Sequence, residues 1–145
     1  MAGTGISRGL GAVALRLGLA VGAIAPAYAA ADCAAAARSV PFAPQLHPLG
    51  EGRWWVAADR GEATPANGGV VAQALLLHAG SRWWLVGSGP TPAWGDALAC
   101  AARAAAAAEV GDVIDTRAQP ELVLGNAAFP TARLWALGDV ARAMA

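Results

Sequence analysis

Few side chains in this sequence are spaced for chemistry. The two histidines, His47 and His78, lie far apart, and neither belongs to a recognisable ligand motif with Cys, Asp or Glu. Zinc sites usually draw four ligands from such residues. His47 lies in a proline-rich stretch and His78 next to a turn, so we expect a solvated loop residue and an exposed strand end rather than metal ligands.

A glycine-rich stretch, Gly87-Ser88-Gly89-Pro90-Thr91-Pro92, is the next candidate. Ser88 lacks the G-x-S-x-G spacing of a nucleophile elbow, and no histidine is placed to act as its base. Backbone N–H groups between a strand and a helix can cradle a phosphate. However, neither G-x-G-x-x-G nor the P-loop pattern is present, and the chain has no Lys. We expect a tight strand-to-helix turn here rather than an anion site.

The two cysteines, Cys33 and Cys100, are a pairable number in an oxidising compartment. Two interpretations stay open, because the sequence gives no distance between them. In the first, a disulfide joins the start of the mature chain to its middle. In the second, Cys33 is free in a frayed tail and Cys100 is buried in a helix.

The first residues are typical of a secretory signal. Arg8 and Arg16 flank the start of an apolar run over 17–25, and Ala27-Tyr28-Ala29 supplies the small residues of a cleavage site. The run is short and broken by Gly and Pro, whereas a membrane span needs about 20 apolar residues. We predict a signal peptide over 1–29, a periplasmic or secreted protein and no stable membrane span. An uncleaved anchor is the alternative.

Composition excludes several classes of protein. The chain has 145 residues, which is the size of one domain. Ten basic residues, all Arg, balance ten acidic ones, so there is no basic stripe for a nucleic-acid partner. Only 14% of the residues are charged and 57% are hydrophobic, which excludes intrinsic disorder.

Periodicity and turn signals predict an α+β unit over 51–145, preceded by an Ala- and Pro-rich linker over 30–50 without regular structure. The predicted strands, rich in aromatic and β-branched residues, are 53–58, 70–79, 82–86, 110–116 and 133–137. A helix over 93–108 follows the cap Thr91 and the first-turn Pro92, with a stop at Gly111. Asp139 is placed to cap a final helix.

Two segments then form a familiar pair. The first holds Pro65-Ala66-Asn67-Gly68-Gly69 and, after a strand and a turn, 85–98; the second is 113–129. Their order and spacing resemble the N-terminal half of metallo-β-lactamase-fold hydrolases, in particular the exported quinoprotein relay system zinc metallohydrolases. The resemblance runs from Gln45 to the C-terminus, and it implies one half of an αββα sandwich.

The resemblance also implies a zinc site. The family motif Thr-His-x-His-x-Asp-His-x-x-Gly-Asn binds one or two zinc ions, which activate a water for hydrolysis. Here Thr116, Gly125 and Asn126 are retained, and Gly87 takes the place of the Asp in the first segment. The four ligand positions carry other side chains: Arg117, Gln119, Glu121 and Leu122.

This row of side chains argues against a zinc cofactor and against catalytic residues. Arg117 is a permanent cation, Leu122 has no lone pair, and Glu121 alone does not hold zinc against water. We hypothesise that Arg117 pairs with Glu121 or Asp115 in place of the metal. The sequence thus indicates an exported, metal-free relative, a pseudoenzyme that acts as a binding or accessory protein.

Two other functions stay open, because a fold does not determine a function. The chain is a zinc-dependent metallohydrolase if other ligands or a completing partner supply the site. It is a small structural periplasmic domain if the likeness is accidental.

Half a sandwich leaves one sheet face bare, rich in Val, Leu and Trp. Either the chain is a truncated product, or a partner or a second copy, as in a homo-oligomer, covers the face. Each adjacent Trp pair on a strand sends one ring to each face. The resemblance places the loop after Arg60 near the mouth of the active-site groove, so Trp55 is our candidate for ligand contact.

Overall fold

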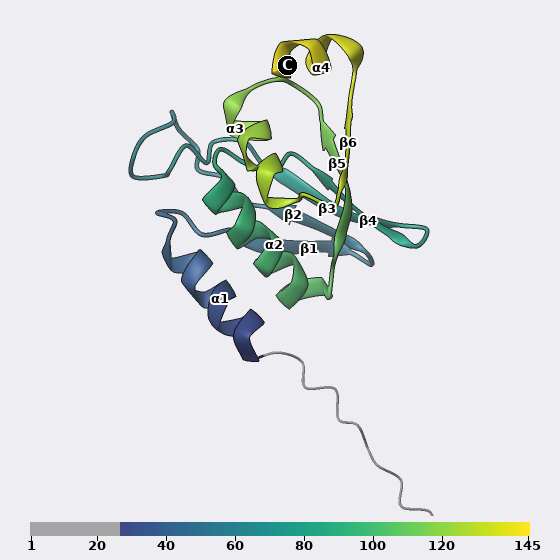
Figure 1. Cartoon of the computed structure of the whole chain (residues 1–145). Helices are drawn as coiled ribbons and strands as arrows, with labels where there is room; N and C mark the ends of the chain where they lie inside the picture. Colours follow the sequence, from purple (N-terminus) through teal and green to yellow (C-terminus); the bar gives the residue numbers. More distant parts are fainter. Residues whose placement is uncertain (1–26) are drawn as a thin grey trace, which may run out of the picture.

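The computed structural model describes residues 27–145 (Figure 1). The predicted signal peptide falls almost entirely outside the described residues. Within the described part of the chain, no helix is long and apolar enough to cross a membrane.

The described chain is a mixed α+β structure, as the sequence predicts. Its elements in chain order are α1 (Ala27–Arg38), β1 (Leu46–Gly50), β2 (Arg53–Val56), β3 (Ala74–Ala79), β4 (Arg82–Val86), α2 (Pro92–Ala106), β5 (Val110–Asp115), α3 (Pro120–Val123), the 3-10 helix η1 (Leu124–Ala128), β6 (Arg133–Ala136) and α4 (Gly138–Met144).

The six strands form one sheet in the order β1-β2-β3-β4-β5-β6. The first four strands pair antiparallel, and β4, β5 and β6 pair parallel. Parallel neighbours need a crossover connection, and each crossover here carries helical turns: α2 before β5, and α3 with η1 before β6. The carboxyl ends of the parallel strands therefore meet at one edge of the sheet.

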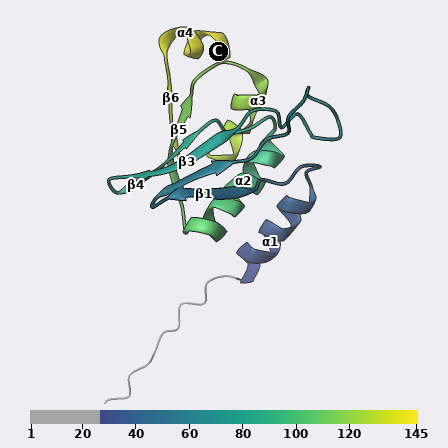
Figure 2. The same ribbon diagram turned by 180° about the vertical axis from the view of Figure 1, so that it is seen from behind.

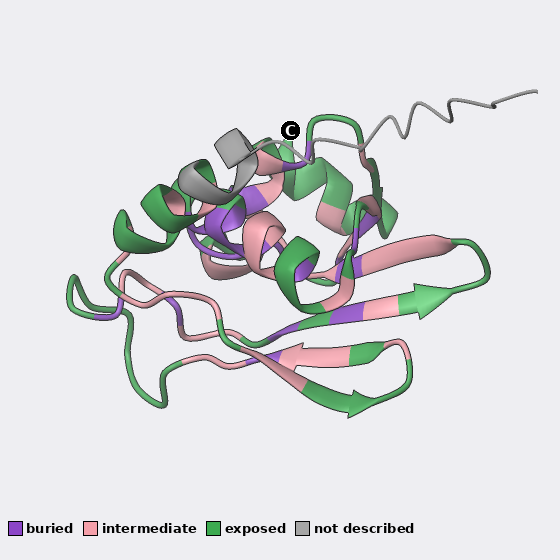
Figure 3. Cartoon of the chain, turned by 90° about the horizontal axis from the view of Figure 1, so that it is seen from below, coloured by how far each residue is buried: buried purple, intermediate pink, exposed green. Residues whose placement is uncertain are grey.

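In residues 27–145, the helices cover a single face of the sheet, and the other face carries none (Figure 3). Trp94 and Leu98 of α2 pack on Val56, Leu85 and Val113 of the strands and form the main core. The Trp pair in β4, Trp83 and Trp84, points to the two faces of the sheet in turn, as expected. Trp83 packs on the helix-covered side, and Trp84 lies on the opposite face beside Leu77.

Helix α1 lies beside α2 in both views of the ribbon (Figures 1 and 2). A disulfide between Cys33 and Cys100 joins the two helices. It closes a loop with a sequence separation of 67, so it restricts the unfolded chain strongly.

The start of α2 follows from local sequence. The Thr91 side chain accepts a hydrogen bond from the Trp94 N–H at 3.1 Å, and Pro92 takes the first turn. The helix ends earlier than predicted, because Ala107 adopts a left-handed conformation with φ of 49° before β5 begins at Val110. Gly111 is therefore a strand residue, not the helix stop.

The prediction of an irregular linker over 30–50 is wrong. Its alanine-rich part belongs to α1, and its proline-rich part contains β1. β1 is the edge strand of the sheet, where Pro48 is tolerated because it needs no ladder donor on the open side. His47 is consequently a strand residue, stacked on Trp55 with ring centroids 4.7 Å apart, and not a solvated loop residue.

Two smaller boundaries also differ. The strand predicted over 70–79 begins only at Ala74, because Val70 and Val71 belong to the preceding turn. Helix α4 begins at Gly138 after Leu137, so Asp139 lies in its first turn and does not cap it.

Candidate functional site

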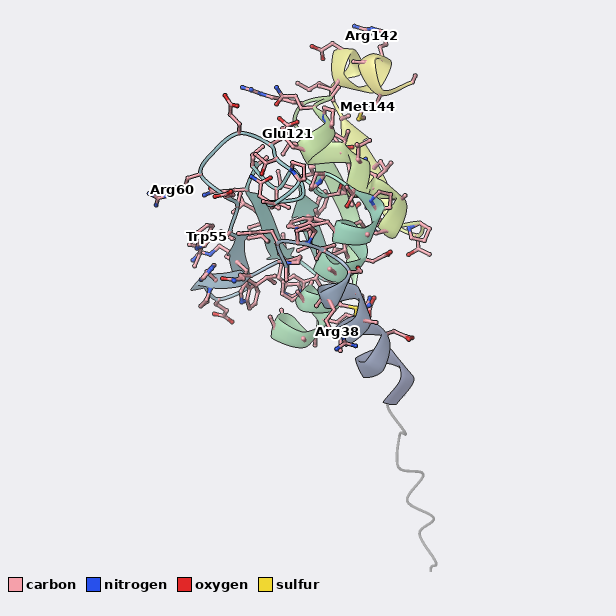
Figure 4. The ribbon with its side chains drawn as sticks, turned by 90° about the vertical axis from the view of Figure 1, so that its left-hand side faces the viewer. Arg38, Trp55, Arg60, Glu121, Arg142 and Met144 are labelled. Atoms are coloured by element: carbon pink, nitrogen blue, oxygen red, sulfur yellow. A yellow bond between two sulfur atoms is a disulfide. The ribbon has the colours of Figure 1, made fainter. Side chains whose placement is uncertain are left out.

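The degenerate motif follows the carboxyl end of β5 and enters α3. Arg117 and Gln119 are exposed, whereas Glu121 and Leu122 are half-buried in the short helix. Glu121 lies toward α4 and well apart from Trp55, which belongs to β2 (Figure 4). The structure therefore does not bring these two predicted residues into one site.

Leu122 connects this segment to the end of β4. Its carbonyl accepts hydrogen bonds from the Ser88 N–H at 2.7 Å and from the Ser88 hydroxyl at 3.2 Å. A Cβ built on Gly87 would lie 3.2 Å from the Leu122 Cδ2 methyl. The two positions matched to the family's Asp and third His thus come together, but through an apolar contact.

Ser88 is fully buried, so it is not an exposed nucleophile. Gly87 and Gly89 on either side have φ of 76° and 99°, which glycine adopts without strain. The stretch is a tight turn between β4 and α2, as predicted.

The retained glycine of the motif has a packing role. The Gly125 N–H donates to the Gly89 carbonyl at 2.9 Å. A side chain on Gly125 would collide with the backbone of Ser88, and one on Gly95 would come within 2.6 Å of the Gly125 carbonyl oxygen. Close approach of α2, η1 and the turn after β4 therefore requires glycine here.

The retained Asn126 binds a buried carboxylate. Its Nδ2 donates to Asp115 Oδ2 at 2.8 Å, and Asp115 is 1% exposed. Asp115 Oδ1 and Asn126 Oδ1 have no hydrogen-bond partner within the described residues. Burial raises the pKa of Asp115, and the hydrogen bond from Asn126 opposes the rise only in part.

The hypothesis that Arg117 pairs with Glu121 or Asp115 is wrong. In the described part of the chain, both ion pairs are made by Asp112, with Arg82 and Arg133. Over residues 27–145, no three side chains of His, Cys, Asp or Glu gather closely enough to hold a metal ion.

The second candidate is the uncovered face of the sheet, which we call the open face. Register partners on adjacent strands place side chains on this face, among them Trp55, Leu75, Leu77, Trp84, Ile114 and Trp135. Leu75 and Trp135 are 37% and 45% exposed. Trp55, proposed for ligand contact, belongs to this face and stacks on His47.

The open face holds a charged cluster on β4, β5 and β6, toward one edge of the sheet. The Asp112 carboxylate is fully buried and contacts Arg82 Nε at 2.6 Å, Arg133 Nε at 2.9 Å and Trp135 Nε1 at 2.8 Å. Burial is the largest influence on the pKa of Asp112 and raises it. The hydrogen bonds from Trp135 and Arg133 and the charges of Arg133 and Arg82 outweigh burial, so the pKa lies below its ordinary value.

The sequence interpretation missed this cluster. A signal existed, because Asp112 interrupts the apolar residues of β5 and the two neighbouring strands each begin with an Arg. Recognising it required the strand order and register.

A shallow groove of about 410 Å³ lies beside the cluster, at the carboxyl ends of the parallel strands. Trp84 and Trp135 border it with ring centroids 6.0 Å apart. Ile114, Ala136 and Leu137 make the rest of the lining mostly apolar, and Asp115 and Thr116 also border the groove. The groove therefore suits an apolar group rather than a metal-bound water.

Comparison with solved structures shows which fold this is. A metallo-β-lactamase from Hirschia baltica is 18% identical, with a TM-score of 0.58 over 70% of this chain and 47% of that chain. The mono-zinc form of the metallo-β-lactamase FIM-1 from Pseudomonas aeruginosa is 16% identical, with a TM-score of 0.60 over 71% and 46%. A metallo-β-lactamase from Erythrobacter litoralis is 18% identical, with a TM-score of 0.56 over 70% and 44%. No family model and no curated protein matches the sequence.

The chain therefore has a metallo-β-lactamase-like fold, as the sequence resemblance predicts. It spans less than half the length of these solved structures. At such low identity the likeness shows the fold alone.

Proposed function

We propose that this chain is an exported, non-catalytic metallo-β-lactamase-fold protein that acts as a binding or accessory protein. The observation that carries the proposal is the contact between Leu122 and Gly87. A methyl group of Leu122 lies next to Gly87, the position matched to the family's Asp. Leu122 itself stands at the position matched to the family's third His. Apolar packing thus fills the space that zinc ligands would need.

The other side chains of the row support the same conclusion. Catalytic zinc usually needs three protein ligands and an open position for water. The Arg117 guanidinium offers no acceptor atom to a metal, and Glu121 offers one carboxylate, which is too little for zinc held against water.

The segment is also held in place without a metal. Ser88 binds the Leu122 carbonyl, Gly125 binds Gly89, and Asn126 binds Asp115. These hydrogen bonds supply the local order that a bound ion would otherwise impose. Retention of the fold after loss of the ligands is therefore physically reasonable.

Export and kinship complete the proposal. The signal sequence supports cleavage after Ala29 or Ala30, and the Cys33–Cys100 disulfide is consistent with an oxidising compartment. The two matched segments support kinship with the quinoprotein relay system metallohydrolases. N-terminal sequencing of protein recovered from the periplasm tests the cleavage.

The decisive experiment measures zinc and iron in the purified, signal-cleaved protein by mass spectrometry after dialysis. We expect far less than one metal ion per chain. The matched control carries Arg117→His, Gln119→His, Glu121→Asp and Leu122→His, and zinc uptake by it would show that ligand loss alone removed the site. Near-stoichiometric metal in the unmodified chain would overturn the proposal and restore the zinc-dependent hydrolase.

A further inference from the structure

We propose that the disulfide between Cys33 and Cys100 is a thiol–disulfide exchange site for small thiols as well as a structural link. Cys33 takes up the incoming thiol, and Cys100 leaves as a thiolate that the Arg103 guanidinium stabilises. The site lies on the helix side of the molecule and does not depend on the proposed function, so each proposal can fail without the other.

The Arg103 side chain lies against the disulfide. Its Nη2 is 3.3 Å from Cys100 Sγ and 3.9 Å from Cys33 Sγ. Arg103 follows Cys100 by three positions on α2, a spacing that places two side chains on the same side of a helix. Within residues 27–145, Arg103 forms no ion pair with a carboxylate. Its positive charge is therefore available to a negative charge on sulfur.

A cation beside a disulfide determines which sulfur leaves. A cysteine next to an arginine ionises more readily. In thiol–disulfide exchange, the sulfur whose thiol is more acidic leaves faster. The guanidinium is nearer to Cys100 than to Cys33, so Cys100 is the better leaving group and Cys33 is the sulfur that a thiolate attacks.

The disulfide is also within reach of a small thiol. Both cysteines are half-buried. A surface cavity of about 250 Å³ is lined by the two cysteines and otherwise by alanines and one proline. A second cavity, of about 320 Å³, borders Cys100 and Arg103. Exposed disulfides are more often the labile or regulatory ones, whereas structural disulfides resist reduction.

The acidic side chains near the site weaken the effect of Arg103 without cancelling it. Asp32 and Asp96 border the same cavity as Arg103. Both are exposed, so water screens their charges, and neither forms an ion pair in the described part of the chain. Arg103, in contrast, contacts the Cys100 sulfur directly.

The exchange step balances with a thiol as its only co-reactant. A thiolate attacks Cys33 Sγ and forms a new S–S bond to it. The bond between Cys33 and Cys100 breaks, and its electron pair stays on Cys100 Sγ as the thiolate charge. After this step α1 carries a mixed disulfide and is no longer covalently joined to α2.

The test uses the full, disulfide-bonded chain and 2-mercaptoethanol, a small neutral thiol. Samples taken early are stopped with acid, free thiols are blocked with N-ethylmaleimide, and peptides are analysed by mass spectrometry. In singly reacted chains we expect the mercaptoethanol group on Cys33 and the maleimide on Cys100. The rate should rise in proportion to the thiol concentration while circular dichroism shows a folded chain.

Variants then assign the rate to the Arg103 charge. Arg103→Gln should slow the exchange by at least about three-fold, because the leaving sulfur loses its cation. Arg103→Lys keeps the charge and should react faster than Arg103→Gln. The matched control is Arg38→Gln, which changes the net charge equally. Arg38 ends α1 and makes no hydrogen bond to either sulfur in the described residues, so its variant should react like the parent (Figure 4).

Four results would overturn the inference. The folded chain does not react, or its rate is independent of thiol concentration, since the disulfide would then open only after unfolding. The mercaptoethanol group is found mainly on Cys100. Arg103→Gln slows the exchange by less than about three-fold, or no more than Arg38→Gln does. Arg103→Lys reacts no faster than Arg103→Gln, which would make the role of Arg103 one of packing and not of charge.

Discussion

Asp112 and Asp115 lie on the same strand, β5, yet their pKa values shift in opposite directions. Asp112 points to the open face, where two arginines and an indole N–H keep it charged. Asp115 points to the helix-covered face, where one amide is its hydrogen-bond partner and burial favours the neutral form. The covered face is stabilised by exclusion of water, and the open face by paired charges on β4, β5 and β6.

The largest expected effect is on the free energy of unfolding, and it distinguishes the tightly packed covered face from the open face. Trp94→Ala should lower the free energy of unfolding by about 3–5 kcal/mol, because Trp94 is 2% exposed in the main core. Trp84→Ala on the open face should cost about 1 kcal/mol. Urea unfolding followed by circular dichroism measures both. Equal losses would show that the open face is not a free surface.

The next largest effect concerns the disulfide between α1 and α2, on the helix-covered side of the sheet. Replacing both Cys33 and Cys100 by Ser should lower the free energy of unfolding by about 2–4 kcal/mol, since the disulfide closes a long loop. Thermal unfolding of the unmodified chain with and without reductant gives an independent estimate. A variant as stable as the parent would mean that α1 docks on α2 without help from the covalent link.

The two aspartates predict pH effects of opposite sign. The lowered pKa of Asp112 contributes stability above its unfolded-state pKa, and this contribution is lost as pH falls through the folded-state value. The raised pKa of Asp115 contributes stability at low pH that is lost as pH rises through the folded-state value. Unfolding measured across the acidic range therefore reports both groups.

Single variants separate the two contributions. Asp112→Asn should destabilise the chain at neutral pH and make its stability less sensitive to acid. Asp115→Asn should stabilise it at neutral pH relative to acidic pH, since no buried carboxylate then needs to ionise. Variants that change the pH dependence in the same direction would contradict the contrast between the faces.

The smallest expected effect on folding is that of Arg53→Gln. Arg53 is exposed on the open face, so its replacement should change the free energy of unfolding by no more than about 0.5 kcal/mol. This result would show that the Arg53 charge contributes little to folding. A loss above 1 kcal/mol, read from denaturant midpoints, would assign Arg53 a structural role instead.

Part of the fold could be predicted because local signals determine it. Runs of aromatic and β-branched residues bounded by turn residues predict β2 and β4, and Thr91 with Pro92 predicts the start of α2. The part that failed lies in 30–50, where Pro48 signalled a linker although edge pairing with β2 makes the segment a strand. Short edge strands depend on their neighbour more than on their own composition.

The candidate site, too, could be predicted only in part. The sequence alone determined which side chains follow β5, among them Arg117 and Leu122. It did not determine the partners of Asp112 and Asp115, so the proposed Arg117 ion pair failed and the arginine cluster was missed.

The sequence by itself thus determined five of the six strands and the main helix, because these follow from residue type and short spacing. Only the tertiary structure decided that Leu122 packs beside Gly87, that Cys33 meets Cys100, and that two arginines hold Asp112 beneath an open face. Each of these contacts joins residues distant in the chain. Strand order, register and face determine such contacts, and side-chain identity alone does not.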